Sequence, residues 1–162
     1  MKTVHFYDYS AEVIGRLGIV EEDGALTQIF KVGTDRLPAH DFVLGETELL
    51  KETDRQLREY FSGQRKEFDL PLLLRGTDFQ KKVWQALRAI PFGQTASYQE
   101  IADRVGSPKA CRAVGQANHH NRLSIIVPCH RVIGKSGALT GYGGGMEMKE
   151  YLLSLEKRKG AI

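Results

Sequence analysis

A cysteine and a histidine stand side by side in the apolar stretch IIVPCHRVIG, residues 125–134. The thiolate form of cysteine is a strong nucleophile, and a nearby imidazole can accept the proton that the thiol must lose. Successive side chains of a regular strand point to opposite faces, so Cys129 and His130 would meet only through a turn after Pro128 or a bridging water. The stretch indicates a nucleophile in a packed frame, although the dipeptide alone does not separate this role from plain packing.

The segment before this stretch carries the signals of a helix that would support it. Thr77 is suited to cap a helix that runs to about Ala89, and Pro91 follows as a stop signal. Apolar residues recur at helical spacing within it, and Trp84 is among them. We therefore predict a core helix here, with Trp84 buried rather than exposed as a ligand platform.

Two further helices are predicted between residues 97 and 118. SYQE at 97–100 has the S-x-x-E form of a capping box, which places Ser97 at an N-cap, and Gly106 is suited to end this helix. Ser107 and Pro108 then match the N-cap and first position of another helix. A pair of short helices joined by so tight a turn resembles a helix-turn-helix, although plain helical bundles contain such pairs too.

The second helix of this pair has an unusually small outward face. Its spacing assigns four residues to the core: Ala110, Ala113, Val114 and Ala117. Lys109, Arg112 and Gln116 are left for the outside, and Arg112 is the only long side chain beyond the first turn. So slim a helix can approach a nucleic-acid backbone closely, with Arg112 as a single projecting side chain, although small residues also permit tight helix packing.

The first half of the chain predicts a small α/β unit. The turn signal EEDG at 21–24 separates two strand-like segments and indicates a β-hairpin. Residues 46–63 follow with helical periodicity. The predicted fold class is α/β: a small N-terminal domain of antiparallel strands plus a helix, residues 1–72, then a mostly helical domain, residues 73–162, with a helix-turn-helix at about 97–118.

Charge separates the two halves. Residues 1–72 hold 9 Lys and Arg against 14 Asp and Glu, a net charge of −5, whereas residues 73–162 hold 14 against 6, a net charge of +8. The second half is therefore suited to a polyanion, which favours nucleic-acid binding by the helix pair. Charge alone would equally suit a solvated surface.

The remaining composition sets limits on class and compartment. The chain has 162 residues, of which 41% are hydrophobic, and contains no apolar run of membrane-spanning length and no signal-peptide core. Its two cysteines, Cys111 and Cys129, form no CxxC pair and no zinc-like spacing with histidine. We expect a cytoplasmic protein with free thiols and no metal.

The second half resembles the O6-alkylguanine-DNA alkyltransferase family over nearly all of residues 75–156. The resemblance rests on PCHRV at 128–132 and on longer segments in the same order: FQKKVWQALRAIPFGQTASYQEIA, SPKACRAVGQAN, IIVPCHRVIG and SGALTGYGGGMEMKEYLLSLE. The N-terminal half is less diagnostic, but its size and hairpin fit the small domain that precedes the active-site domain in that family.

The resemblance implies roles for individual residues. Cys129 would be the alkyl acceptor, His130 the base that generates its thiolate, Glu156 the carboxylate that orients His130, and Asn121 the hinge of the active-site loop. Tyr142, Gly143 and Val132 would line the pocket for the flipped base. Six residues would contact DNA: Arg112, Tyr98, Ala113, Gly115, Lys109 and Gln116.

The same resemblance implies DNA repair by direct reversal. The protein would bind double-stranded DNA through the minor groove as a monomer, rotate the O6-alkylguanine out of the stack and fill the gap with Arg112. Cys129 would then take the alkyl group, with O4-alkylthymine as a further candidate substrate. A thioether has no hydrolysable bond, so each molecule would react once, without a cofactor.

Three other classes share parts of this pattern. A non-catalytic alkyltransferase-like DNA binder would lack the reactive cysteine that this chain has. A cysteine hydrolase using Cys129, His130 and Glu156 would turn over many times but would not account for the basic helix pair. A helix-turn-helix regulator would need more base-reading side chains than this helix offers.

Overall fold

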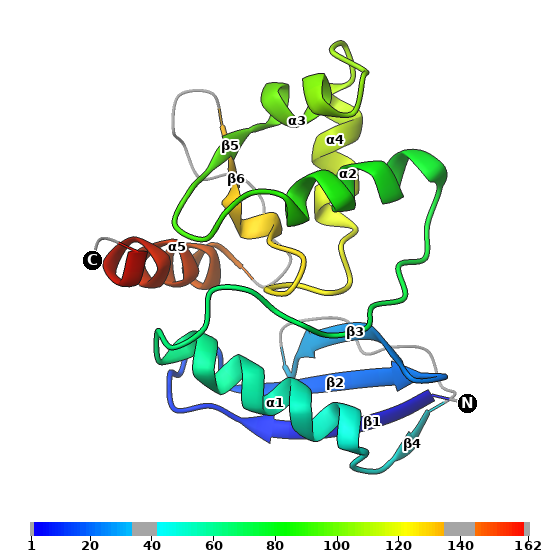
Figure 1. Ribbon diagram of the computed structural model, residues 1–162, viewed down its shortest axis with the longest axis vertical. Coiled ribbons are helices and arrows are strands. Elements are labelled where there is room, and N and C mark those ends of the chain that lie inside the picture. Colours follow the sequence, from blue (N-terminus) through cyan, green and yellow to red (C-terminus); the bar gives the residue numbers. More distant parts are fainter. Residues whose placement is uncertain (1, 34–41, 135–144, 161–162) are drawn as a thin grey trace. The chain divides into compact units, whose positions relative to one another are not determined.

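The computed structural model describes residues 2–33, 42–134 and 145–160, and the chain forms two compact units, Met1–Leu74 and Arg75–Ile162. In these described ranges, no helix is both long enough and apolar enough to cross a membrane. Figure 1 gives the order of the elements along the chain.

The first unit is built on the predicted hairpin. Strands β2 (Arg16–Glu22) and β3 (Ala25–Lys31) pair antiparallel, and Asp23 and Gly24 between them both have positive φ, 52° and 81°. Two left-handed residues define the type I′ turn that matches the twist of a hairpin, which is why Asp-Gly stands there.

Two further strands complete a sheet of order β3-β2-β1-β4. Strand β1 (Lys2–Asp8) runs antiparallel to β2, and the short β4 (Phe42–Leu44) runs parallel to β1. The predicted class of antiparallel strands plus a helix is confirmed, with the addition of this one parallel pair. Helix α1 (Glu48–Phe61), capped by Thr47, lies across one face of the sheet (Figure 1).

The core of this unit depends on one glycine. Val4, Val20 and Phe30 form a buried cluster. A Cβ atom at Gly18 would lie 2.3 Å from the ring of Phe30. Only glycine therefore allows the ring to lie against strand β2.

The second unit begins with two helices at the predicted positions. Helix α2 (Asp78–Arg88) follows Thr77, and helix α3 (Tyr98–Arg104) follows Ser97. Each cap forms the full reciprocal capping box with the residue three positions on, which satisfies two backbone donors at each helix start. Trp84 is buried, as predicted, and its indole N–H donates to the carbonyl of Ala117 at 2.9 Å.

The next helix, α4 (Cys111–His119), corrects two predictions. It starts at Cys111 after Ala110, without a side-chain cap, so Ser107 is not the N-cap. Instead, the carbonyl of Ser107 accepts from the N–H of Ala110, and the Gln99 side chain donates to the carbonyl of Pro108. These bonds hold residues 107–110 in a turn rather than a helix.

The later start of α4 also changes which of its residues face the core. Val114, Ala117 and Asn118 are buried, whereas Ala113 is exposed and Ala110 only half-buried. Ala113 was predicted both to lie in the core and to contact DNA. Its exposure shows that it does not lie in the core.

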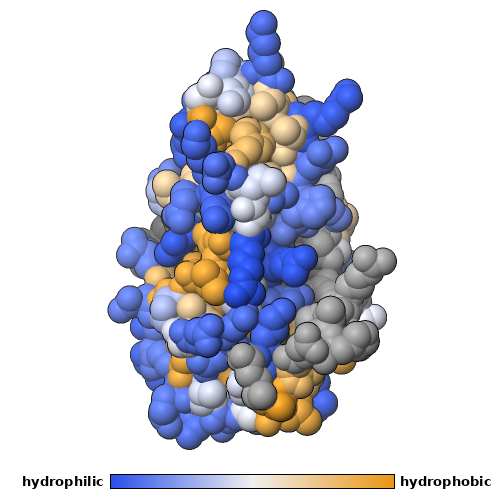
Figure 2. Space-filling view, turned by 90° about the vertical axis from the view of Figure 1, so that its right-hand side faces the viewer, coloured by the Kyte–Doolittle hydropathy of each residue, from blue (hydrophilic) through white to orange (hydrophobic). Residues whose placement is uncertain are grey.

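The rest of the second unit was not anticipated in this detail. A 3-10 turn, η1 (Cys129–Arg131), leads into strand β6 (Val132–Ile133), which pairs parallel with β5 (Ala96–Ser97). Helix α5 (Met146–Gly160) packs against η1 (Figure 1). On the face drawn in Figure 2 the surface is largely hydrophilic, with apolar side chains in separate patches.

Candidate active site

The 3-10 turn η1 fixes Cys129 and His130. Pro128 precedes the turn, and its carbonyl accepts from the N–H of Arg131 at 3.0 Å. The N–H of Val132 donates to the carbonyl of Cys129 and closes the turn. Cys129 is only 3% exposed, and His130 is fully buried. The predicted turn after Pro128 is thus present, and neighbouring residues there need not point to opposite faces.

The buried carboxylate of Glu156, on α5, binds two residues of this turn. Glu156 is 1% exposed and accepts from Nε2 of His130 at 2.6 Å. It also accepts from Nε and Nη2 of Arg131, at 2.8 and 3.0 Å, and from the N–H of Gly93 at 3.2 Å. Arg131 donates a further bond to the carbonyl of Ile90 at 2.7 Å, so its guanidinium ties the turn both to Glu156 and to the segment just after α2.

These contacts decide the charges of the pair. Burial raises the pKa of Glu156, but the hydrogen bond from His130 and the Arg131 guanidinium outweigh it and lower the value to about 2. Burial lowers the pKa of His130, and its bond to Glu156 opposes this only in part. Glu156 is therefore ionised, so the proton of neutral His130 is on Nε2, and Nδ1 is the nitrogen that can accept a proton.

The thiol of Cys129 is protonated at rest. Burial raises its pKa to about 11, while hydrogen bonds from Asn121 and Ser124 and the charge of Lys149 lower it. Formation of the thiolate is therefore a step that the site must assist.

Asn121, the predicted hinge residue, ties the loop that leads to Cys129. Its amide donates to the carbonyl of Val127 at 2.8 Å, and its side-chain oxygen accepts from the N–H of Leu123 at 2.9 Å. Between these anchors, buried Ile125 has φ of 77°, a left-handed conformation that is strained for a β-branched residue. The loop thus stores strain four residues before the cysteine.

Two residues beside Cys129 were missed by the sequence reasoning. Asn118 donates to the carbonyl of Cys129 at 3.3 Å. Within the described part of the chain, Oδ1 of Asn118 and Nδ1 of His130 are the buried side-chain atoms without a hydrogen-bond partner. Lys149 is fully buried and donates to the carbonyl of Val132 at 2.6 Å. The sequence did hold a signal for Lys149, because it stands seven residues before Glu156 and therefore lies on the same face of the helix.

Most of the predicted DNA-contacting residues gather around one hollow of about 550 Å³ on α3 and α4. Tyr98, Arg112, Gly115 and Gln116 line it, together with Cys111, His119 and His120. A Cβ atom at Gly115 would lie 3.8 Å from the ring of Tyr98, which is an ordinary van der Waals contact. Exposed Lys109 and Ala113 are not among the residues that line this hollow.

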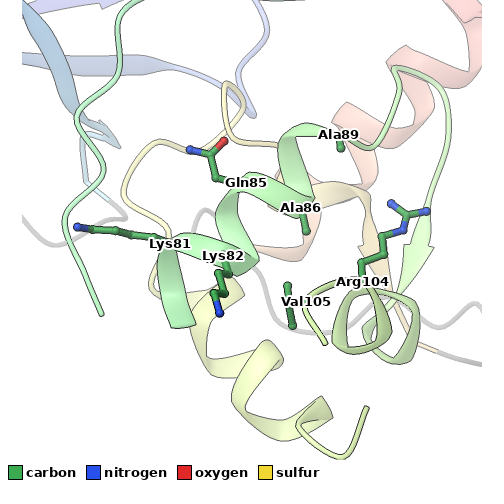
Figure 3. A pocket seen from close by; sticks show the side chains of 7 residues that line it. All are labelled: Lys81, Lys82, Gln85, Ala86, Ala89, Arg104 and Val105. Carbon is green, nitrogen blue, oxygen red and sulfur yellow. The ribbon is translucent and has the colours of Figure 1, made fainter. Parts of the chain in front are cut away.

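A second groove, of about 660 Å³, lies between α2 and the end of α3. Figure 3 shows Ala86 and Val105 in its middle and the cations Lys81 and Arg104 toward its two ends. Lys82, Gln85 and Ala89 complete its lining. The groove adds exposed positive charge to the second unit.

The predicted substrate pocket is described only in part. Tyr142 and Gly143 lie outside the described residues, whereas Val132 is buried beside Cys129. Within residues 2–33, 42–134 and 145–160, no three His, Cys, Asp or Glu side chains come together in a way that could hold a metal ion.

Comparison of the chain with known proteins identifies its family. Residues 78–158 match the family described as 6-O-methylguanine DNA methyltransferase, DNA binding domain, and residues 5–74 match 6-O-methylguanine DNA methyltransferase, ribonuclease-like domain. A methylated-DNA–protein-cysteine methyltransferase of Bacillus subtilis, described as constitutive, is 50% identical over 159 residues, which cover 95% of this chain and 96% of that protein. This chain belongs to the 6-O-methylguanine DNA methyltransferase family.

Solved structures of the family agree with this assignment. The crystal structure of the Mycobacterium tuberculosis O6-methylguanine methyltransferase has a TM-score of 0.90 and 46% identity, covering 98% of this chain and 94% of that one. The Mycobacterium tuberculosis OGT in complex with DNA has a TM-score of 0.88 and 46% identity, covering 97% and 94%. The resemblance and the fold class predicted from the sequence are thereby confirmed.

Proposed function

We propose that this protein repairs DNA by direct reversal, transferring the alkyl group of O6-alkylguanine irreversibly to Cys129. The observation that carries this proposal is the buried contact of 2.6 Å between His130, in the turn that begins with Cys129, and Glu156 on α5. Membership of the family supports the same reaction, because its relatives are methylated-DNA–protein-cysteine methyltransferases.

The reaction proceeds in two steps. His130 accepts the thiol proton of Cys129 at Nδ1, directly or through one water, and Glu156 stabilises the imidazolium that forms. The thiolate then attacks the alkyl carbon, so that a carbon–sulfur bond forms while the carbon–O6 bond breaks and its electron pair goes to the guanine. The proton taken from Cys129 balances the one that the guanine regains. The product thioether has no hydrolysable bond, so the protein reacts once.

The target guanine must first leave the duplex. Flipping costs a few kcal/mol, and a side chain that fills the gap offsets part of this cost. We assign this role to Arg112, with Tyr98 crowding the neighbouring phosphate and the slim α4 entering the minor groove. Positive charge in the second unit supplies phosphate contacts, and two named relatives support DNA as the partner, because one is crystallised with DNA and another acts on methylated DNA.

The remaining assignments complete the proposal. Residues 1–72 form a structural domain, and residues 73–162 form the active-site and DNA-binding domain. The protein acts as a monomer in the cytoplasm, and no step above needs a cofactor. Sedimentation tests the oligomeric state, and competition with a minor-groove ligand such as netropsin tests the groove.

The decisive experiment uses a duplex with one O6-methylguanine. After incubation, intact mass and peptide mapping should find one methyl group per protein, on Cys129. A Cys129→Ala variant should bind the duplex and leave the lesion, whereas the matched Cys111→Ala variant should accept the methyl group. Repeated turnover, or an intact lesion with unmodified Cys129, would overturn the proposal.

A further inference from the structure

Helix α5 carries a second buried charge that the reaction above does not use. Within residues 146–158 of this helix, the buried residues are Met148, Lys149, Leu152, Leu155 and Glu156. Lys149 and Glu156 are seven residues apart, which is two helical turns, so they share the face that packs against η1. One helix face thus presents an anion to His130 and a cation two turns away.

The position of the Lys149 ammonium is fixed with respect to Cys129. Nζ of Lys149 donates to the carbonyl of Val132 at 2.6 Å, and the N–H of Val132 donates to the carbonyl of Cys129. One 3-10 turn therefore separates the carbonyl that holds the ammonium from the reactive residue. The two groups interact electrostatically: the ammonium lowers the pKa of Cys129, and the sulfur raises the pKa of Lys149.

A fully buried lysine is costly, because its ammonium loses the hydration that it has in water. Burial accordingly lowers the pKa of Lys149 below its ordinary value of 10.5. The cost is offset whenever an anion forms nearby, since opposite charges attract strongly where water is excluded. The thiolate of Cys129 is such an anion.

We propose that Lys149 is the cationic partner of the Cys129 thiolate. Its ammonium, held on the Val132 carbonyl, offsets the charge that develops on sulfur when His130 takes the thiol proton. Lys149 keeps its own proton throughout, and the negative charge passes to guanine O6 as the carbon–sulfur bond forms. The role in transfer rests on the proposed function, whereas the charge pairing exists without DNA.

The test therefore uses the DNA-free protein and methyl iodide, a reagent small enough for a buried thiol. Methylation of Cys129 is measured by peptide mass spectrometry at pH 7.5, with Cys111 as internal reference. Lys149→Met removes charge and donor, Lys149→Gln keeps a donor without the charge, and Lys149→Arg keeps the charge. Exposed Lys157 on the same helix supplies the control Lys157→Met. Every variant is checked for folding by thermal unfolding.

Lys149→Met and Lys149→Gln should methylate Cys129 at least about tenfold more slowly, because loss of a nearby opposite charge raises the thiol pKa by about 1 to 3 pH units and lowers the thiolate fraction. Lys149→Arg and Lys157→Met should retain the rate. Should Lys149→Met fail to fold, Lys149→Gln decides. The other charged or titratable groups at this turn, His130, Arg131 and Glu156, are unchanged in all variants.

The pH profile separates charge from structure. Lys149 is charged at low pH and loses its charge as the pH rises through its lowered pKa, so the advantage of the wild type over Lys149→Gln should shrink toward pH 10.5. A constant ratio across the range, or a Lys149→Gln rate equal to that of the wild type, would overturn the proposal. Failure of transfer from DNA with this pattern intact would instead count against the proposed function.

Discussion

Replacing Glu156 by glutamine tests how far one carboxylate holds the active-site turn. Its pKa falls from 4.5 in the unfolded chain to about 2 in the folded one. A difference of this size is worth about 3 kcal/mol of stability at neutral pH, the same order as the cost of removing one partner from a buried ion pair. Glu156→Gln also leaves the buried guanidinium of Arg131 without its counter-charge.

The assay uses the single tryptophan, Trp84, which is buried in the second unit. Urea unfolding followed by its fluorescence at pH 7 should give a free energy of unfolding lower by about 3 kcal/mol for Glu156→Gln. The matched variant Glu150→Gln, an exposed position on the same helix, should stay within about 0.5 kcal/mol of the wild type.

The pH dependence gives the result that would refute this reasoning. Because the folded pKa of Glu156 is depressed, its contribution is present above the unfolded value of 4.5 and is lost as the pH falls toward about 2. The difference between wild type and Glu156→Gln should therefore narrow below about pH 4.5. An equal difference at pH 7 and pH 3.5, or no difference at all, would show that the charge of Glu156 does not stabilise the turn.

Three further predictions concern other parts of the molecule. Gly18→Ala should destabilise the first unit by about 1–3 kcal/mol, measured by circular dichroism, because the new Cβ would lie 2.3 Å from the Phe30 ring. Stability should decline as the pH falls below 6.5, because His130 stays neutral when folded and takes up a proton when unfolded, and His130→Gln should weaken this decline in urea titrations at pH 7 and 5. Arg112→Ala should slow methyl transfer from duplex DNA about tenfold or more, because flipping costs a few kcal/mol and the variant lacks the side chain that fills the gap. Methylation of Cys129 by methyl iodide should be unchanged. An equal loss of transfer in the exposed control Arg88→Ala would show that the effect comes from the loss of one positive charge rather than from the position of Arg112.

Local signals predicted the parts of the fold that depend on local bonds. The capping boxes at Thr77 and Ser97 and the Asp23-Gly24 turn are each satisfied by residues within three positions of one another. The start of α4 could not be predicted in this way. Ser107 and Pro108 have the form of an N-cap, but a side chain from α3, nine residues away, captures the Pro108 carbonyl.

The site residues also differ in whether the local sequence or the packing of distant segments reveals them. Cys129 and His130 are adjacent in the sequence and were recognised by their chemistry, whereas Glu156 came only from the family resemblance, since 26 residues separate it from His130. Lys149 was missed because a lysine in a helix is usually solvated. Only the packing of α5 against η1 brings that lysine to the end of the turn that carries the thiol.

The burial of Cys129 has a consequence for the lifetime of the unreacted protein. Because burial raises the pKa of the Cys129 thiol, a smaller fraction of molecules carries a thiolate at pH 7 than for a free cysteine. Oxidants and stray electrophiles in solution react mainly with thiolates, so they would consume this cysteine more slowly than a free one. For a protein that is proposed to act only once, such chemical inertness preserves its repair capacity until a damaged base arrives.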